Sequence, residues 1–300
     1  MPESRYKIRP FEYSEMIGWS FSRYATFLSC KRQYYYQYYG RFDLENVVRI
    51  NVLKNLTNIP LEIGNICHDI IKALLERLQK SPDPIDQQKF FQFSEDLGRR
   101  IFQTKNFEEV YYNQTDRVDF DESIFPKVIQ AMANFLYSDR LQWIMEEALA
   151  HNRDWIIEPE GFGECRIDNQ KVYCKVDFAF PFDDEMYVLD WKSGKQDSAK
   201  HMTQLIGYAT WVHYHFDKDV GQIKPVTAYL LPDYEEKSID IQDLDFPDFA
   251  RRIREETDEM YTFCEDPDFN FPKKKEEFKM TESVNFCKTC RYRELCDRAG

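Results

Sequence analysis

Two aspartates and a lysine stand close together in a stretch that alternates between apolar and polar residues. Asp177 lies in the segment 172–180, and Asp190 and Lys192 lie in the segment 186–192. This alternation predicts two strands, and the two consecutive aspartates between them are typical of a tight turn. A hairpin centred on that turn places Asp177 directly opposite Asp190, with their Cβ atoms about 4.5–5.5 Å apart.

The same alternation predicts which side chains share a face of the hairpin. Asp177 lies on the polar face of the first strand, and Val176 and Phe178 both lie on its opposite face. In the second strand, Lys192 lies on the same face as Asp190. Two carboxylates this close repel each other unless a cation or a proton lies between them. Two carboxylates and an amine at one end of a hairpin therefore predict a metal site suited to phosphate chemistry. A bulge in either strand would shift this pairing.

A histidine stands on the most clearly amphipathic helix of the chain. Residues 61–80 have the apolar spacing of a helix, which carries His68 and, one turn earlier on the same face, Gly64. A glycine at that position allows the helix backbone to approach another element closely. A single histidine on a helix is most often a structural residue, so the helix alone leaves a ligand role for His68 open.

The rest of the pattern is that of an α/β protein. A helix predicted at 197–216 places Gln204 and Tyr208 four residues apart on one face. An aromatic stretch ends a helix predicted at about 20–39, and its tyrosines either pack against neighbouring helices, which we favour, or stack on nucleic-acid bases. The sequence further predicts strands at 154–166 (followed by an Asp168-Asn169 turn), 224–231 and 237–241, and helices within 87–151 and at 246–264.

Three cysteines late in the sequence have the spacing of a metal-binding segment. Two residues separate Cys287 from Cys290, and Cys296 follows after five more. Three thiolates leave one coordination position, and Cys30 is the best candidate to fill it. Four sulfur ligands suit an iron–sulfur cluster or a structural zinc ion, and the spacing alone does not choose between them. The other cysteines lack such spacing and are expected to be buried: Cys67, Cys165, Cys174 and Cys264.

Composition and charge narrow the class of protein. The 300 residues carry a net charge of −13, and 43% of them are hydrophobic. This charge argues against a protein that coats duplex DNA with a broad basic face, but metal-binding carboxylates would contribute to it in a nuclease. The first residues include no apolar signal region, and no run approaches the ~20 apolar residues that span a bilayer. We therefore expect a soluble, cytoplasmic protein with no membrane partner, whose cysteines are metal ligands or buried thiols.

Taken in order, these motifs resemble those of a nuclease family. Gly64-x3-His68, Asp177, Asp190-Trp191-Lys192 and Gln204-x3-Tyr208 together resemble the RecB-like branch of the PD-(D/E)XK nucleases. The four cysteines make the sequence similar to the iron–sulfur members of that branch. These include AddB-type nuclease domains and the CRISPR-associated exonuclease involved in spacer acquisition. The resemblance extends from about residue 20 to residue 296.

The resemblance implies a fold and an arrangement of the chain. The fold would be α/β, with a PD-(D/E)XK, restriction-endonuclease-like core in which helices flank a central mixed sheet. Residues 1–300 would form a single RecB-like nuclease domain. Its parts would be N-terminal helices with Cys30 and His68 (20–80), a helical insertion (81–151), the catalytic sheet core (152–245), and a C-terminal helix with the cysteine segment (246–300). The iron–sulfur cluster would join the N- and C-terminal segments, so its role would be architectural.

The resemblance also implies roles at the metal site. His68, Asp177 and Asp190 would hold Mg²⁺ or Mn²⁺, with the carbonyl oxygen of Trp191 as a further ligand. The ion would activate a water molecule and neutralise charge on the scissile phosphate. Lys192 would orient that water or stabilise the charge that develops on the phosphate oxygens.

Further roles follow from the same resemblance. Gln204 and Tyr208 would position nucleic acid or brace the catalytic residues, and Cys30, Cys287, Cys290 and Cys296 would bind a [4Fe-4S] cluster. The implied reaction is metal-dependent hydrolysis of phosphodiester bonds in DNA, with an exonuclease that prefers single strands or ends as the favoured form. Its setting would be DNA repair, recombination or CRISPR spacer acquisition, with protein partners from such a complex.

Three alternatives stay open at the level of the sequence. An endonuclease or flap nuclease could use the same core. A catalytically silent iron–sulfur module that only binds nucleic acid is the second alternative, although the intact set of Asp177, Asp190 and Lys192 argues against it. A zinc-bound scaffold protein is the third.

Overall fold

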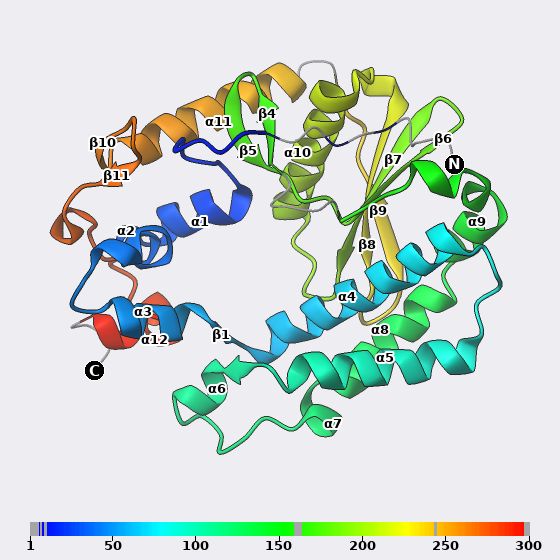
Figure 1. The fold of residues 1–300 in the computed structure, drawn as a ribbon, viewed down its shortest axis with the longest axis horizontal. Helices are drawn as coiled ribbons and strands as arrows, with labels where there is room; N and C mark the ends of the chain where they lie inside the picture. The colour runs from blue at the N-terminus through cyan, green and yellow to red at the C-terminus, as the bar shows by residue number, and fades with distance from the viewer. Residues whose placement is uncertain (1–5, 7, 9–10, 159–163, 243–244, 297–300) are drawn as a thin grey trace.

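A mixed five-stranded sheet lies at the centre of the protein (Figure 1). The computed structural model describes residues 6, 8, 11–158, 164–242 and 245–296. Among the described strands of this sheet, β7 and β8 run parallel, and the other neighbouring pairs are antiparallel. The strand order is β3 (Ile156–Ile157), β6 (Phe178–Phe182), β7 (Glu185–Lys192), β8 (Ile223–Tyr229) and β9 (Glu235–Ser238). This arrangement agrees with the expected α/β class and a mixed central sheet.

Helices cover both faces of the sheet (Figure 1). Parallel pairing of β7 with β8 requires a crossover, which α10 (Ser198–Phe216) supplies. Val188 of β7 belongs to the apolar cluster on the α10 side, whereas its neighbours Leu189 and Trp191 belong to the cluster on the α4 side. The α10 side includes α11 (Asp245–Tyr261), and the opposite side is formed by α4 (Ile59–Lys80), α5 (Gln87–Phe102), α8 (Phe125–Leu136) and α9 (Asp139–Glu146).

The central hairpin has the register expected from the sequence, but its first strand is shorter. Phe178 pairs with Leu189, which is the register that places Asp177 opposite Asp190. The prediction of one continuous strand over 172–180 was wrong, because the four residues 174–177 separate β5 (Gln170–Tyr173) from β6. The prediction that Val176 and Phe178 share a face was also wrong. Val176 lies in the α10-side cluster and Phe178 in the α4-side cluster.

The helix predicted at 20–39 is interrupted at Cys30. Ser20 caps α1 (Phe21–Ser29), as its side chain accepts a hydrogen bond from the Arg23 amide. Cys30 then has extended backbone angles, and α2 (Lys31–Tyr34) follows, continued by a π-helical turn at Tyr35–Tyr39. Four tyrosines of this aromatic stretch are buried, namely Tyr34, Tyr35, Tyr36 and Tyr39. They therefore pack in the protein core and do not present a surface for base stacking.

Several short elements complete the chain. The Asp168-Asn169 turn has φ values of 48° and 64°, and it joins β4 (Glu164–Ile167) to β5 in a separate hairpin. The strand predicted at 154–166 is described only at its ends, as β3 and β4, because residues 159–163 lie outside the described part. The remaining elements include α3 (Val47–Lys54), β1 (Leu56–Thr57), β2 (Asn106–Phe107), α6 (Glu108–Tyr111), α7 (Phe120–Ser123), β10 (Cys264–Asp266), β11 (Phe271–Pro272) and α12 (Val284–Thr289).

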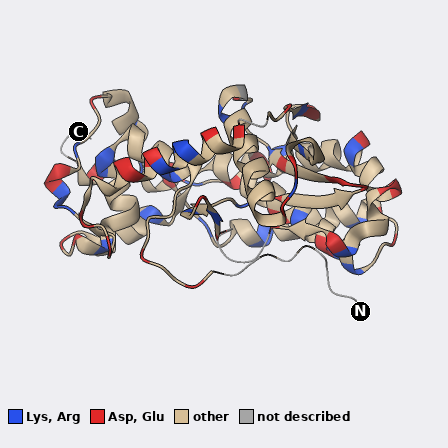
Figure 2. Cartoon of the chain, turned by 90° about the horizontal axis from the view of Figure 1, so that it is seen from above, with Lys and Arg blue, Asp and Glu red and all other residues tan. Residues whose placement is uncertain are grey.

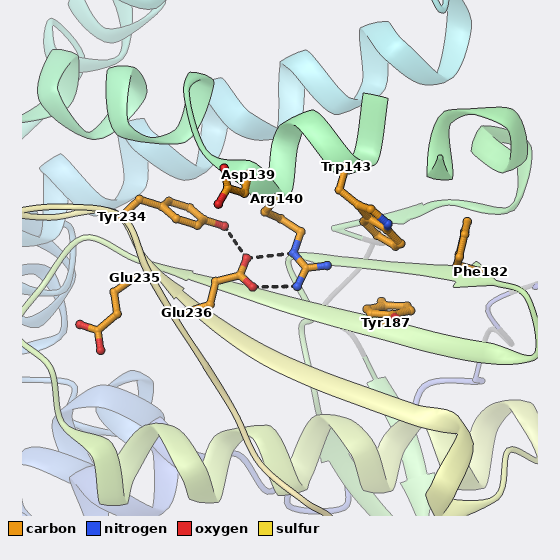
Figure 3. A pocket seen from close by; sticks show the side chains of 8 residues that line it. All are labelled: Asp139, Arg140, Trp143, Phe182, Tyr187, Tyr234, Glu235 and Glu236. Carbon is orange, nitrogen blue, oxygen red and sulfur yellow. Dashed lines mark hydrogen bonds and ion pairs between the residues drawn. The ribbon is translucent and has the colours of Figure 1, made fainter. Parts of the chain in front are cut away.

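Charged residues of both signs are distributed along the helices, as Figure 2 shows. Among the described residues, no helix is both long enough and apolar enough to cross a membrane.

The helices within residues 81–151 contribute directly to the core that supports β7. Phe135 of α8 is fully buried, and its ring meets the Trp191 ring at a centroid distance of 5.2 Å in an edge-on arrangement. Trp191 is itself 1% exposed and lies between Asp190 and Lys192 in the strand. The packing of α8 therefore supports the backbone that carries these two residues.

Replacing Phe135 with alanine tests this packing. Phe135→Ala leaves a cavity against Trp191, and we expect the free energy of unfolding to fall by about 3–5 kcal/mol in chemical denaturation. The matched control is Tyr137→Ala on an exposed side chain just beyond α8, expected to cost less than about 1 kcal/mol. Equal losses in the two variants would contradict a supporting role for α8.

Candidate active site

His68 lies where α4 meets the end of β7. Its Nε2 is 2.9 Å from the carbonyl oxygen of Trp191, and its Nδ1 is 3.2 Å from Oδ1 of Asp177. Gly64 suits the close approach of the helix to the end of β7, because a Cβ atom at that position would lie 3.2 Å from Oγ of Ser193 and the serine would have to shift slightly. The helix position that the sequence left open is therefore adjacent to the hairpin carboxylates.

Asp177 connects the helix to the strand. Its Oδ1 faces His68, and its Oδ2 accepts a hydrogen bond of 2.9 Å from the Trp191 amide. The residue stands just before β6, at the end of the segment 174–177 that joins the separate hairpin of β4 and β5 to the central sheet. From this position its carboxylate contacts both the backbone of β7 and the imidazole.

Asp190 and Lys192 form the other half of the site. The Nζ of Lys192 lies 2.8 Å from Oδ1 and 2.7 Å from Oδ2 of Asp190, whose residue is 1% exposed. The Tyr208 hydroxyl donates to Asp190 Oδ1 at 3.3 Å, and Gln204 Nε2 donates to that hydroxyl at 2.5 Å. The spacing of four residues on α10 thus places both side chains in one chain of hydrogen bonds that ends on Asp190.

The charges of the site compensate one another. Burial alone would lower the pKa of His68, but the Asp177 carboxylate outweighs it and raises that pKa to about 9. Both partners of the imidazole are acceptors, so it satisfies them together only when both ring nitrogens carry protons. Burial raises the pKa of Asp190 to about 6, although Lys192 opposes the shift. Burial acts in the same direction on Asp177, but His68 outweighs it and holds that pKa below its usual value.

Glu158 is a residue of the site that the sequence did not single out. It directly follows β3, its amide donates to the Asp177 carbonyl oxygen at 2.9 Å, and its φ of 33° is unusual for a residue other than glycine. Ligand atoms of His68, Glu158 and Asp177 all lie within 4.8 Å of one another. Glu158 carried no distinguishing motif, since its place opposite Asp177 depends on the pairing of β3 with β6.

The four motif cysteines form a separate centre between the two ends of the chain. The Cys30 sulfur accepts a 3.4 Å hydrogen bond from the Thr281 amide, in the segment that leads to Cys287 on α12. Burial, together with smaller contributions from Cys30, Cys296 and Cys287, raises the pKa of Cys290 to about 11. The mutual effect indicates that the thiols are neighbours. As expected, the other four cysteines are also buried: Cys67, Cys165, Cys174 and Cys264.

Comparison with known families assigns the chain. The model of the PD-(D/E)XK nuclease superfamily matches residues 18–297. The chain belongs to this superfamily. A solved structure described as "Crystal structure of SSO0001" is 18% identical, with 67% of this chain and 82% of that chain covered and a TM-score of 0.28. No curated protein matches the chain.

Membership in the PD-(D/E)XK superfamily implies a nuclease with a nucleic-acid substrate. Within this chain, Asp190, Trp191 and Lys192 have the D-x-K order of the motif, and Asp177 stands just before the paired strand β6. The structure brings together the residues predicted from the sequence, which are His68, Asp177, Asp190, Trp191, Lys192, Gln204 and Tyr208. The predicted cysteines lie outside this group, near one another.

The contact between Lys192 and Asp190 can be tested by titration. Because the Lys192 ammonium favours the charged carboxylate, Lys192→Met should raise the pKa of Asp190 above about 6. The side chain should therefore begin to take up a proton at a higher pH than in the wild-type chain. Carboxyl ¹³C NMR of aspartate-labelled, metal-free protein measures this shift. Lys195→Met, in the exposed loop that follows, is the control and should leave the Asp190 titration unchanged.

Proposed function

We propose that this chain is a metal-dependent DNA nuclease of the RecB-like iron–sulfur branch of the PD-(D/E)XK superfamily. One observation carries the proposal: His68, Asp177, Asp190 and Lys192, from α4, the segment before β6, and β7, converge at the end of β7. This combination of imidazole, carboxylates and amine suits phosphodiester hydrolysis better than a structural salt-bridge network, because it places two carboxylates, of which that of Asp190 is buried, beside a backbone carbonyl that can also act as a ligand.

The donor set fits a hard divalent cation. The imidazole of His68, the carboxylates of Asp177 and Asp190, and the Trp191 carbonyl would hold Mg²⁺ or Mn²⁺, and one imidazole is more acceptable to Mn²⁺. Oδ2 of Asp190 is buried without a hydrogen-bond partner, and its 2.7 Å contact with Lys192 is an ion pair outside hydrogen-bond geometry. When bound, the cation would lower the pKa of a ligated water and neutralise charge on the scissile phosphate.

The side chains around the ligands have their own roles. The side chain of Lys192 is 21% exposed and so remains accessible to substrate, where it would orient the attacking water or stabilise charge on the phosphate. Tyr208 fixes the carboxylate of Asp190 through its hydroxyl, and Gln204 fixes the hydroxyl. We assign Gln204 and Tyr208 to bracing the site or positioning the strand.

We favour an exonuclease that takes single-stranded DNA or DNA ends. A net charge of −13, with both signs distributed along the helices, suits a strand that enters a local site better than a duplex bound along a broad basic face (Figure 2). Repair, recombination or CRISPR spacer acquisition, with partner proteins, is the setting that we infer from the resemblance. An endonuclease or flap nuclease on the same core is the alternative, and a silent nucleic-acid-binding module is disfavoured by the complete set of side chains.

Nuclease activity is tested with end-labelled oligonucleotides and Mn²⁺. We expect the wild-type chain to degrade linear DNA, and Asp190→Asn and Lys192→Met each to lower the rate by about 10²–10⁴-fold, since each removes a group that acts on the reacting phosphate or its metal. Asp184→Asn in the exposed hairpin turn is the matched control and should retain activity.

The choice of substrate separates the alternatives. Resistance of a circular single strand supports an exonuclease, and its cleavage indicates an endonuclease. Labels at the 5′ and 3′ ends report polarity. If single-stranded, duplex and flapped DNA all stay intact with cluster-loaded protein, no hydrolase function remains.

For the cysteine centre we propose a [4Fe-4S] cluster held by Cys30, Cys287, Cys290 and Cys296. The two segments are also joined by polypeptide contacts, because the Arg32 amide donates to the Lys279 carbonyl at 3.3 Å. Thiolates from both sides are the ligands such a cluster requires, and zinc is the alternative for the same set. When bound, the cluster would supply covalent links between these segments, so its role in the proposal is architectural.

The cluster proposal predicts iron and a characteristic colour. Anaerobically purified protein should contain iron and acid-labile sulfide and absorb at about 400 nm. Cys290→Ala should lose the iron and the absorption, and it should unfold at a lower temperature. Cys67→Ala, at a buried cysteine of α4, should keep the iron. If the protein instead contains one equivalent of zinc and lacks that absorption, the four cysteines hold a structural zinc ion and the cluster proposal is wrong.

A further inference from the structure

A glutamate and two lysines form a second charged group beside the candidate active site. The Nζ of Lys72 lies 3.2 Å and the Nζ of Lys175 lies 3.1 Å from the same oxygen, Oε2 of Glu158. The Glu158 side chain is 10% exposed, whereas those of Lys72 and Lys175 are 33% and 52% exposed. The carboxylate is therefore buried beneath two ammonium groups that a ligand can reach.

The backbone fixes this group to the residues that would hold the metal. Lys72 follows His68 by four residues on α4, so the two side chains lie one turn apart on the same face. Lys175 precedes Asp177 by two residues, and the Glu158 amide donates to the Asp177 carbonyl oxygen. The lysines cannot move far from the site unless α4 or the hairpin moves as well.

We propose that Lys72 and Lys175 bind a backbone phosphate of the nucleic acid adjacent to the scissile one, and that Glu158 holds their two ammonium groups in position. This inference rests on the nuclease function proposed above. Each ammonium has three N–H donors, and Lys72 gives one of them to the shared carboxylate while Lys175 contacts it as an ion pair, so further donors remain for phosphate oxygens. Two lysines against one glutamate also leave a net positive charge, in a chain whose overall charge is −13.

The geometry favours a role for Glu158 in positioning the two lysines, and not a role as a metal ligand. Its carboxylate is near the ligand atoms of His68 and Asp177, but both lysines contact it. A divalent cation on this oxygen would have to displace two ammonium groups about 3 Å from it, whereas Oδ2 of Asp190 contacts the single ammonium of Lys192. Glu158 also gives the lysines a partner other than the carboxylate of Asp177.

Salt-dependent binding tests the two lysines. Lys72→Gln, Lys175→Gln and the double variant remove charge but keep most of the side chain. The probe is a fluorescent single-stranded DNA oligonucleotide in EDTA, titrated with the full cluster-loaded protein over a range of salt concentrations. We expect each single variant to raise Kd about 5-fold and the double variant about 20-fold. The slope of log K against log salt should become shallower by about 0.7 for each lysine.

Lys224→Gln is the matched control. Lys224 is also a lysine paired with one glutamate, at 3.1 Å from Glu185, and it has a similar exposure of 42%. It lies at the opposite end of the sheet from Lys192, so this variant should bind like the wild-type chain. Suppose that the wild-type chain binds and cleaves DNA, but the double variant of Lys72 and Lys175 has the same Kd and the same salt slope as Lys224→Gln. That result overturns the proposed phosphate site and leaves the nuclease proposal standing. A wild-type chain that neither binds nor cleaves overturns the nuclease proposal and this one with it.

A second measurement separates phosphate binding from metal binding. Mn²⁺ titration of Glu158→Gln and of the double lysine variant should give a Kd within about 2-fold of wild type, because none of the three residues holds the metal in this proposal. A loss of more than about 10-fold in Glu158→Gln would make Glu158 a ligand and overturn its assignment as the residue that positions the lysines. In the Mn²⁺ cleavage assay, the double variant should raise KM and leave kcat within about 3-fold.

Discussion

The side chain of Asp177 is the point on which the arrangement of the site depends. Its two oxygens contact the His68 ring of α4 and the Trp191 amide of β7, and its own carbonyl accepts from the Glu158 amide after β3. Three elements distant in sequence are thus held at one residue. Loss of this carboxylate would leave the imidazole and an amide without their acceptor, and it would remove the connection between α4 and the end of the strand.

The two aspartates differ because their surroundings differ. Asp190 is almost fully buried, and burial raises its pKa to about 6, whereas the pKa of Asp177 is held low by His68. Without a metal, the imidazolium of His68 and the ammonium of Lys192 compensate the pair. A divalent cation could take over that compensation only if the imidazole released a proton, so metal binding in the proposed nuclease must be linked to pH.

The sequence predicted the register and the partners of the site, but not that residues 174–177 lie outside the central sheet and lead into it from a separate hairpin. Alternation of apolar and polar residues with a period of two identifies the exposed face of a strand only when one face of the sheet is polar. Here helices cover both faces of the sheet. Val176 and Phe178 are both fully buried, so an apolar pattern gave no sign that they enter opposite clusters. The break at Cys30 was missed for a related reason, because the adjacent Arg32 amide bonds to Lys279, which is distant in sequence.

The cysteine segments and the active site are not independent of each other. Buried aromatic residues around the cysteines, including Tyr36 and Tyr292, belong to the same apolar cluster as Leu205 and Tyr208 of α10. Tyr208 in turn donates to Asp190, so a residue of this apolar cluster contacts the site directly. In the proposed function, an architectural iron–sulfur cluster would act by holding the segments that carry Tyr36 and Tyr292, which pack in the same apolar cluster as α10.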